Sequence, residues 1–343
     1  MKNYLVVIQN NAEFGFFHTP FWQNIVKDVY KVQSKPLLSM KGSEYAFLTN
    51  FEVNNLLSGH KFSNMPFNFY PEPLYDNKNL FINLILELGK EAKKLGAYTE
   101  LKMTNRLAND IVEKTNLVET TANYVSILKL PSTYDDYRSQ ISKNLRANLN
   151  KRYNKFSKNG FFIKNVSNFT ELDEFYSLLS KTYRNRHQMV CQPKQVFKNL
   201  FQMKDSRFSF EIRTIRNRGN QICSAIAIIL DNHGTAYYPW GITDQKYYKY
   251  ALSYVLINEL IKDCINKHYK IIDFGSTPKS DQDLLRFKSY WGCDNLETYN
   301  YYLHKRPEPV DLNSSYKFLR YIFSKTPMFI INLINPLIVP QLA

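Results

Sequence analysis

A short apolar strand that ends in a Gly-Ser loop and leads to a lysine is the part of this sequence best suited to chemistry. The strand covers residues 271–274, the loop begins at Gly275 and Ser276, and Lys288 follows on a helix with few other charges. Ligands collect at the carboxyl ends of strands in open α/β sheets, because the loops diverge there. Strand alternation places Asp273 and Gly275 on one face. The alternative is a carboxylate that only caps backbone and a solvated lysine.

The block from Asp273 to Gly292, which contains DFGS and LLRFKSYWG, resembles the Fem-type aminoacyltransferases and their relatives in the GNAT acyltransferase superfamily. Three other segments resemble elements of that family in the expected order: the aromatic-Thr-Pro-x-Trp element at 17–22, the proline-rich loop at 66–74 and the strand YYPWGITD at 237–244. The resemblance covers most of residues 14–343. It implies transfer of an aminoacyl group to an amine.

Such a transfer needs a free amine, a polarised carbonyl and stabilisation of the charge that develops in the tetrahedral state. The resemblance matches Lys288 to the lysine of the family's Phe-Lys motif, where a cation steadies the oxyanion or the phosphate of the donor's terminal nucleotide. Asp273 would accept a proton or orient the amine, and it ranks second because the family's chemistry can be largely substrate-assisted. Gly275 and Ser276 would contact donor or acceptor. The other expected substrate-binding residues are Arg286, Tyr238, Trp240, His187 and Arg146.

Three of these expectations depend on local pattern. Tyr238 and Trp240 are expected on the same face of their strand, where they form a stacking surface or, alternatively, part of the core. His187 ends the basic stretch YRNRH, which resembles an element at the end of the same helix in relatives and would line the acceptor pocket. Arg146 lies in a long helix expected from residue 132 or 133 to 158, whose basic side chains would face substrate phosphate or only solvent.

The length of 343 residues exceeds what one hydrophobic core usually supports, so we expect two domains. The first covers residues 1–131, the second covers 132–305 and begins with the long basic helix, and an apolar tail covers 306–343. In the second, a strand and two helices, three antiparallel strands, a helix and a parallel-type return strand follow the order of a GNAT domain. We therefore expect an α/β (α+β) protein of tandem GNAT-like domains, each a mixed, mostly antiparallel sheet flanked by helices.

The charge balance and one missing motif bear on the acyl donor. The 45 Lys and Arg residues outnumber 30 Asp and Glu, which gives a net charge of +15 and favours polyanionic partners. Classical GNAT enzymes cradle the coenzyme A diphosphate with a Gly-rich loop before the main helix. Residues 243–251 contain no glycine. The Fem-type relatives also lack that loop, and their donor is an aminoacyl-tRNA. Aminoacyl-tRNA and acyl-CoA both stay open as donors, with no tightly bound cofactor.

The cysteines, histidines and chain ends limit the setting. Four cysteines lie far apart, which favours reduced thiols in the cytoplasm, and the six histidines show no ligand spacing, so we expect no metal site. The apolar run near the N-terminus is too short for a signal peptide. No charged residue follows Lys325, and three prolines argue against a spanning helix. The tail therefore favours peripheral contact with the cytoplasmic membrane face, or it packs on the first domain.

We expect a cytoplasmic acyl or aminoacyl transferase that forms an amide on an amino group of a cell-envelope precursor or glycan. The acceptor would be an amine-bearing envelope precursor or a nucleotide- or lipid-linked glycan, and aminoacyl-tRNA would be a partner. Two alternatives stay open. One is acyl-CoA-dependent N-acylation of an amino sugar in polysaccharide biosynthesis, and the other is a non-catalytic basic module that binds RNA or membrane.

Overall fold

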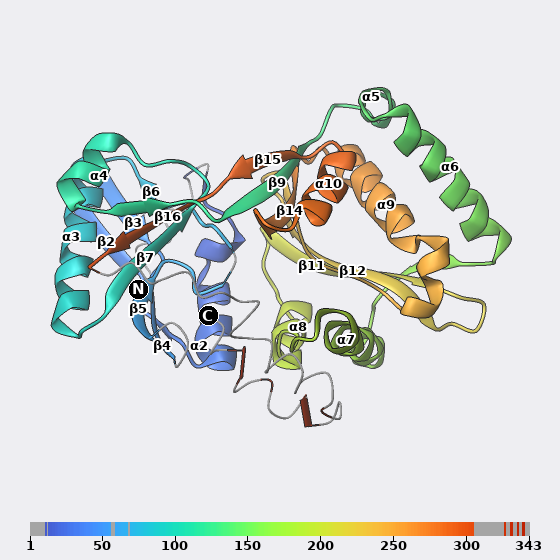
Figure 1. Cartoon of the computed structure of the whole chain (residues 1–343), viewed down its shortest axis with the longest axis horizontal. Coiled ribbons are helices and arrows are strands. Elements are labelled where there is room, and N and C mark those ends of the chain that lie inside the picture. The colour runs from blue at the N-terminus through green and yellow to red at the C-terminus, as the bar shows by residue number, and fades with distance from the viewer. Residues whose placement is uncertain are drawn as a thin grey trace. The chain divides into compact units, whose positions relative to one another are not determined.

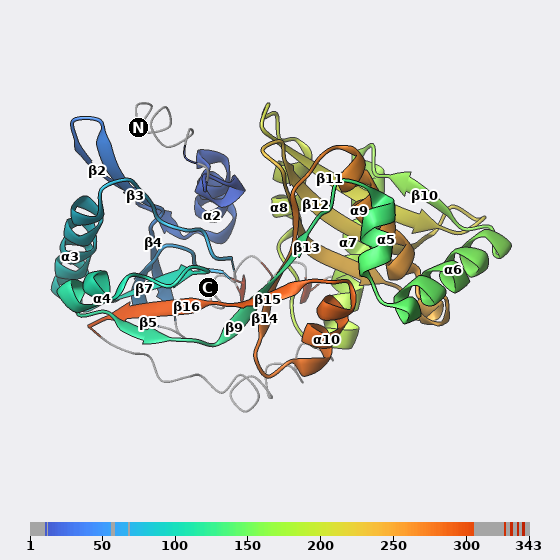
Figure 2. The same cartoon turned by 90° about the horizontal axis from the view of Figure 1, so that it is seen from above.

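The computed structural model describes residues 13–55, 59–67 and 69–304, together with the single positions 11, 326, 330, 331, 335, 338 and 339. The chain divides into two compact units (Figures 1 and 2). The first comprises Met1–Tyr124, Leu296–Ser315 and Pro336–Ala343, and the second comprises Val125–Asn295 and Tyr316–Asn335. Mixed sheets flanked by helices form both units, which confirms the expected α/β class.

A six-stranded sheet in the order β1-β4-β5-β7-β16-β8 forms the centre of the first unit, beside a three-stranded sheet in the order β2-β3-β6. Only β5 and β7 of the six-stranded sheet run parallel. The strands are β1 (Gln33–Ser34), β2 (Leu37–Lys41), β3 (Glu44–Leu48), β4 (Phe51–Asn55), β5 (Gly59–Ser63), β6 (Leu74–Tyr75), β7 (Tyr98–Met103), β8 (Val118–Thr120) and β16 (Tyr299–Leu303). The helices are η1 (Phe16–His18), α2 (Pro20–Tyr30), α3 (Lys78–Lys94) and α4 (Asn109–Thr115).

Helix α3 packs its apolar side onto one face of the six-stranded sheet. Asn77 caps its start by accepting a hydrogen bond from the Leu80 amide at 3.0 Å. Its buried leucines and isoleucines join Phe62, Leu101 and Tyr301 of the sheet in one cluster. Helix and sheet approach closely at Gly89, because a Cβ atom there would lie 2.3 Å from Leu303 Cδ2.

The second unit contains a seven-stranded sheet in the order β10-β11-β12-β13-β14-β9-β15. Its strands are β9 (Asn123–Lys129), β10 (Phe162–Asn165), β11 (Phe208–Arg216), β12 (Ile222–Asp231), β13 (Thr235–Thr243), β14 (Ile271–Pro278) and β15 (Asp294–Glu297). Its helices are α5 (Tyr134–Gln140), α6 (Lys143–Lys158), α7 (Phe169–Thr182), the π turn η2 (Tyr183–His187), α8 (Lys194–Phe201), the 3₁₀ turn η3 (Gln245–Tyr250), α9 (Leu252–Asn266) and α10 (Gln282–Tyr290). Helix α9 packs on one face, and α7 and α8 pack on the other (Figure 1).

The expected single helix from residue 132 or 133 to 158 is wrong, because the chain forms two helices there. Ile141 has an extended backbone (ψ 154°) and ends α5. Ser142 then caps α6 by accepting a hydrogen bond from the Leu145 amide at 3.1 Å. The apolar spacing stays continuous because both helices bury their apolar residues in the same core.

Most of the expected tail, 306–343, lies outside the described residues. Asn335 is described and fully buried, and its amide donates to the Tyr176 hydroxyl of α7 at 3.3 Å. Among the helices that the structure describes, none is long and apolar enough to cross a membrane.

Candidate functional site

Strands β13 and β14 run parallel and then separate. They pair over only three residues each, from Thr235 with Ile271 to Tyr237 with Asp273, although both strands continue further. Beyond that point the strand edges that face each other are not paired with one another. Such a divergence leaves backbone groups available to a substrate between the strands.

The Gly275 peptide lies just past this point and is held from both sides. The Asp273 carboxylate accepts a hydrogen bond from the Gly275 amide at 2.7 Å. The Lys288 ammonium, from α10, donates to the Gly275 carbonyl oxygen at 2.8 Å. Gly275 has a left-handed backbone (φ 76°), and no atom lies within 4 Å of where a Cβ would point. The structure thus brings the expected pair to one residue, where Asp273 caps the Gly275 amide, as the alternative stated, and Lys288 is buried on the Gly275 carbonyl rather than solvated.

Burial shifts the pKa values of both Lys288 and Asp273 toward 7. Lys288 is 5% exposed, and burial lowers the pKa of its ammonium to about 8, against the charge of Asp273, which raises it. Burial raises the pKa of Asp273 to about 6, against its hydrogen bond from Gly275 and the charge of Lys288. A carboxylate and an ammonium therefore coexist near pH 7, each able to exchange a proton.

Three buried polar atoms near this pair have no hydrogen-bond partner in the described part of the chain. They are Ser276 Oγ and Thr277 Oγ1 of β14 and the Trp291 indole Nε1 that follows α10. Buried polar atoms in native proteins are nearly always satisfied, so a water, an ion or a ligand is expected at each of these atoms, as at similar atoms elsewhere such as Trp22 Nε1 and Asn50 Oδ1. Ser276 was expected at the site, whereas Thr277 and Trp291 were not.

Tyr238 and Trp240 do not share one face as a stacking surface, and their packing confirms the alternative that they are core aromatics. Tyr238 packs edge-on against Phe274, with ring centroids 5.4 Å apart. Trp240 packs against Phe197 of α8 at 4.9 Å. The β12–β13 register shifts between Ala227 and Ile229, and this irregularity interrupts the alternation that would have placed both rings on one face.

Two arginines expected to bind substrate have partners of their own. One Arg146 Nη donates to the carbonyls of Arg138, Ser139 and Ile141 at 2.7, 3.2 and 2.8 Å, so Arg146 closes the carboxyl end of α5. The side chain of Arg286 is 76% exposed and pairs with Asp283 at 2.6 Å. The side chain of His187 lies outside the described residues.

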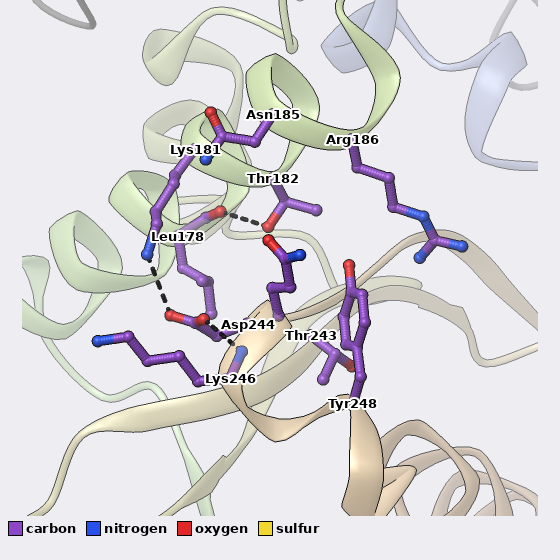
Figure 3. Close-up of a pocket in the computed structure, with 10 residues that line it drawn as sticks. Leu178, Lys181, Thr182, Asn185, Arg186, Thr243, Asp244, Lys246 and Tyr248 are labelled. Atoms are coloured by element: carbon purple, nitrogen blue, oxygen red, sulfur yellow. Dashed lines mark hydrogen bonds and ion pairs between the residues drawn. The ribbon is translucent and has the colours of Figure 1, made fainter.

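A pocket of about 510 Å³ opens where α7 and η2 meet the end of β13 and η3 (Figure 3). Three cations and one carboxylate line it: Lys181, Arg186, Lys246 and Asp244. Asp244 pairs with Lys181 at 3.2 Å and accepts from the Lys246 amide at 3.1 Å. The Arg186 guanidinium lies 5.6 Å from the centre of the Tyr248 ring. Roughly 60 residues of sequence separate the two walls, so their meeting depends on tertiary packing that the sequence pattern did not reveal.

Helix α6 packs against η3, and these two elements form a basic surface beside the pocket. Neither segment contains an acidic residue. The surface comprises Lys143, Lys151, Lys155 and Lys158 of α6 and Lys246 and Lys249 of η3, and none of these forms an ion pair among the described residues. The unneutralised charge suits a polyanion.

Residues 143–289 match the acetyltransferase (GNAT) domain. The crystal structure of FemX is similar, with a TM-score of 0.64 at 12% identity, and the match covers 93% of this chain and 98% of that one. L-PGS from Bacillus licheniformis has a TM-score of 0.57 at 14% identity, with 90% and 98% covered. A tandem GNAT protein from the clavulanic acid biosynthesis pathway has a TM-score of 0.52 at 7% identity, with 89% and 94% covered. No curated protein matches the chain in sequence. These likenesses confirm the tandem GNAT fold, while the Fem family itself stays an expectation.

Proposed function

We propose that this GNAT-fold protein is an N-acyltransferase that joins an aminoacyl group to an amino group of a cell-envelope precursor or glycan. The observation that carries the proposal is the Gly275 peptide, held by Asp273 and Lys288 at the point where β13 and β14 separate. Parallel strands that separate beside a buried acid and a buried amine give an acyl group, an attacking amine and charge-stabilising groups a common meeting place.

In the proposed reaction the acceptor amine attacks the acyl carbonyl carbon, and the carbonyl oxygen takes on negative charge. Lys288 uses one N–H on the Gly275 carbonyl, which leaves two for that oxygen or for a donor phosphate. Asp273 is largely ionised at pH 7 and takes the proton that the amine loses as the amide forms. Collapse of the tetrahedral state breaks the bond to the leaving group, which takes up the proton from Asp273 and so restores the carboxylate. The orphaned Ser276 and Thr277 hydroxyls orient the substrates.

Two features favour aminoacyl-tRNA over acyl-CoA as donor. The basic surface of α6 and η3 suits the phosphate backbone of an RNA. The segment before α9 already uses backbone amides that a diphosphate would need, since Tyr247 N donates to Asp244 O at 2.8 Å and Lys246 N to the Asp244 carboxylate at 3.1 Å. The same carboxylate repels a diphosphate.

The test compares binding of the purified protein to charged tRNA, uncharged tRNA and acetyl-CoA at low and physiological salt. Wild-type protein should prefer charged tRNA at physiological salt, and Lys288→Ala should lose the preference while Lys129→Ala, an exposed control, keeps it. The double variant Lys151→Glu/Lys155→Glu should weaken binding of both tRNAs and flatten the salt dependence. Saturable acetyl-CoA binding without a preference for charged tRNA would refute aminoacyl transfer and favour N-acylation from acyl-CoA.

A further inference from the structure

The first unit also contains a pair of parallel strands with a short ladder, which stops where β5 ends at Ser63. Strands β5 and β7 pair over residues 61–63 and 98–100, three residues each, as β13 and β14 do in the second unit. The last paired residue of the later strand is an acid in both units: Glu100 in the first and Asp273 in the second. The two sheets therefore place a carboxylate at the same structural position.

In the first unit this position belongs to a polar cluster on one face of the sheet. Alternation puts Lys61 and Ser63 of β5 on the same face as Glu100 and Lys102 of β7. The register places Tyr302 of β16 opposite Glu100 and Asn300 opposite Lys102. All six side chains are at least nine-tenths buried. The opposite face carries Phe62, Leu101 and Tyr301 and packs against α3, so the two faces differ sharply in polarity.

Glu100 is the only acid in contact with this cluster among the described residues. Its Oε2 atom lies 3.0 Å from Lys61 Nζ, 3.3 Å from Ser63 Oγ and 3.7 Å from Lys102 Nζ. Its Oε1 atom accepts from the Tyr302 hydroxyl at 3.3 Å. Two lysine side chains thus share one carboxylate, and one positive charge is left over when both lysines are protonated.

Burial of this excess charge within the first unit costs free energy. Burial alone would raise the pKa of Glu100, yet the charges of Lys102 and Lys61 hold it at about 2, so the carboxylate is ionised at pH 7. Burial lowers the pKa of Lys61, which reports how poorly one carboxylate compensates the pair. Buried charges in proteins are normally paired one to one or hold an ion.

We propose that Lys61 and Lys102 form an anion-binding site of the first unit, which takes a carboxylate or phosphate group. An oxyanion there neutralises the excess charge and accepts the ammonium N–H groups that Glu100 does not use. The contact that it replaces is the hydrogen bond from Lys102 Nζ to the Phe67 carbonyl, which is 3.3 Å long and is made to a neutral acceptor. Asn300, which lies opposite Lys102 in the register, donates from Nδ2 to the Tyr302 hydroxyl at 3.5 Å, and its buried Oδ1 has no hydrogen-bond partner among the described residues.

The test measures the melting temperature at pH 7 with inorganic phosphate or acetate, each against chloride at equal ionic strength. Both oxyanions carry the proposed chemistry, and the one that protects at the lower concentration identifies the group that the site prefers. The variants are Lys102→Met, Lys61→Met as a second route if the first fails to fold, and Lys94→Met, an exposed lysine of the same unit that gives the same change of charge.

Wild-type protein and Lys94→Met should gain stability at millimolar oxyanion. Lys102→Met should melt no lower than wild type in chloride, because it removes the excess charge, and its apparent affinity for the oxyanion should fall by at least about tenfold. Equal protection of Lys102→Met and wild type, or protection only at molar salt as expected of an adventitious ion, would overturn the proposal. The measurement involves no acyl transfer, so its result is independent of the proposed reaction.

Discussion

The charges of Asp273 and Lys288 should be coupled, because both groups contact the backbone of Gly275. Direct ion pairs about 4 Å apart interact by about 4 kcal/mol at an effective dielectric constant near 20. The two charges contact opposite ends of Gly275, one at its amide and the other at its carbonyl, so we take roughly twice that distance and an interaction of about 2 kcal/mol. This corresponds to about 1.5 pKa units. Asp273→Asn should therefore lower the pKa of Lys288 from about 8 to below 7.

Heteronuclear NMR of protein with ¹³C-labelled lysine gives this pKa directly, and the Lys288 signal is assigned by its loss in Lys288→Met. Asp283→Asn is the matched control, because Asp283 lies on the same helix but is 92% exposed and pairs with Arg286. The control should leave the Lys288 pKa at about 8. If Asp273→Asn folds normally and leaves it there as well, the two groups are not coupled and the proposed pairing at Gly275 is wrong.

The same two groups set the pH dependence expected of the reaction. Activity should rise as Asp273 ionises near pH 6 and fall as Lys288 loses its proton near pH 8, which gives a bell-shaped profile. Stability should show the opposite signs. Each shift favours the neutral form in the folded state, so the free energy of unfolding falls as pH rises from 3.8 to about 6 and rises as pH goes from about 8 to 10.5.

Three further predictions concern single residues. Gly275→Ala should lower the free energy of unfolding by about 1–2 kcal/mol, because alanine resists a φ of 76°. It should also lower transfer activity by more than the loss of folded protein explains. Urea titration gives the folded fraction, and unchanged activity of the folded protein would contradict the assigned role. Arg146→Met should lower the free energy of unfolding by about 1.5–3 kcal/mol, because it removes three hydrogen bonds to the end of α5, and should leave KM unchanged. A tenfold rise in KM without loss of stability would instead indicate that Arg146 binds substrate. Glu100→Gln should cost about 3–5 kcal/mol at pH 7, since two buried ammonium groups lose their carboxylate. Wild type should lose unfolding free energy as pH falls from 4.5 toward 2, and Glu100→Gln should lose less, as acid titrations monitored by circular dichroism would reveal.

Pattern and motif predicted the architecture and the centre of the site. Apolar spacing predicted the helical region from residue 132 or 133 to 158 that contains α5 and α6, and the strand ending in Gly275 with the lysine that follows it predicted the pair at the strand divergence. Local pattern failed where a single residue or a distant contact decided the outcome. The extended backbone at Ile141 ended a helix whose apolar spacing was continuous, and the register shift in β12–β13 separated Tyr238 from Trp240.

The sequence pattern did not predict the pocket or the first-unit cluster, and the reason is different. The pocket walls come from α7 and η3, and the cluster joins Lys61, Glu100 and Tyr302 across some 240 residues of sequence. Neither arrangement leaves a periodic signal along the chain, because each depends on which strands and helices become neighbours. Sequence pattern identifies the residue types but not which of these residues become neighbours in the fold.

The position of β16 in the first sheet determines when that sheet can form during synthesis. Residues 299–303 lie between β7 and β8, so the six-stranded order is incomplete until nearly the whole described chain has left the ribosome. At usual elongation rates, roughly ten seconds or more pass between residue 124 and residue 303. During that interval β7 presents an open edge, and the buried face of Leu101 lacks its Tyr301 neighbour. The second unit is also incomplete during that interval, because β15 and residues 316–335 come late in the chain, and the nascent first unit keeps an exposed strand edge until β16 is added.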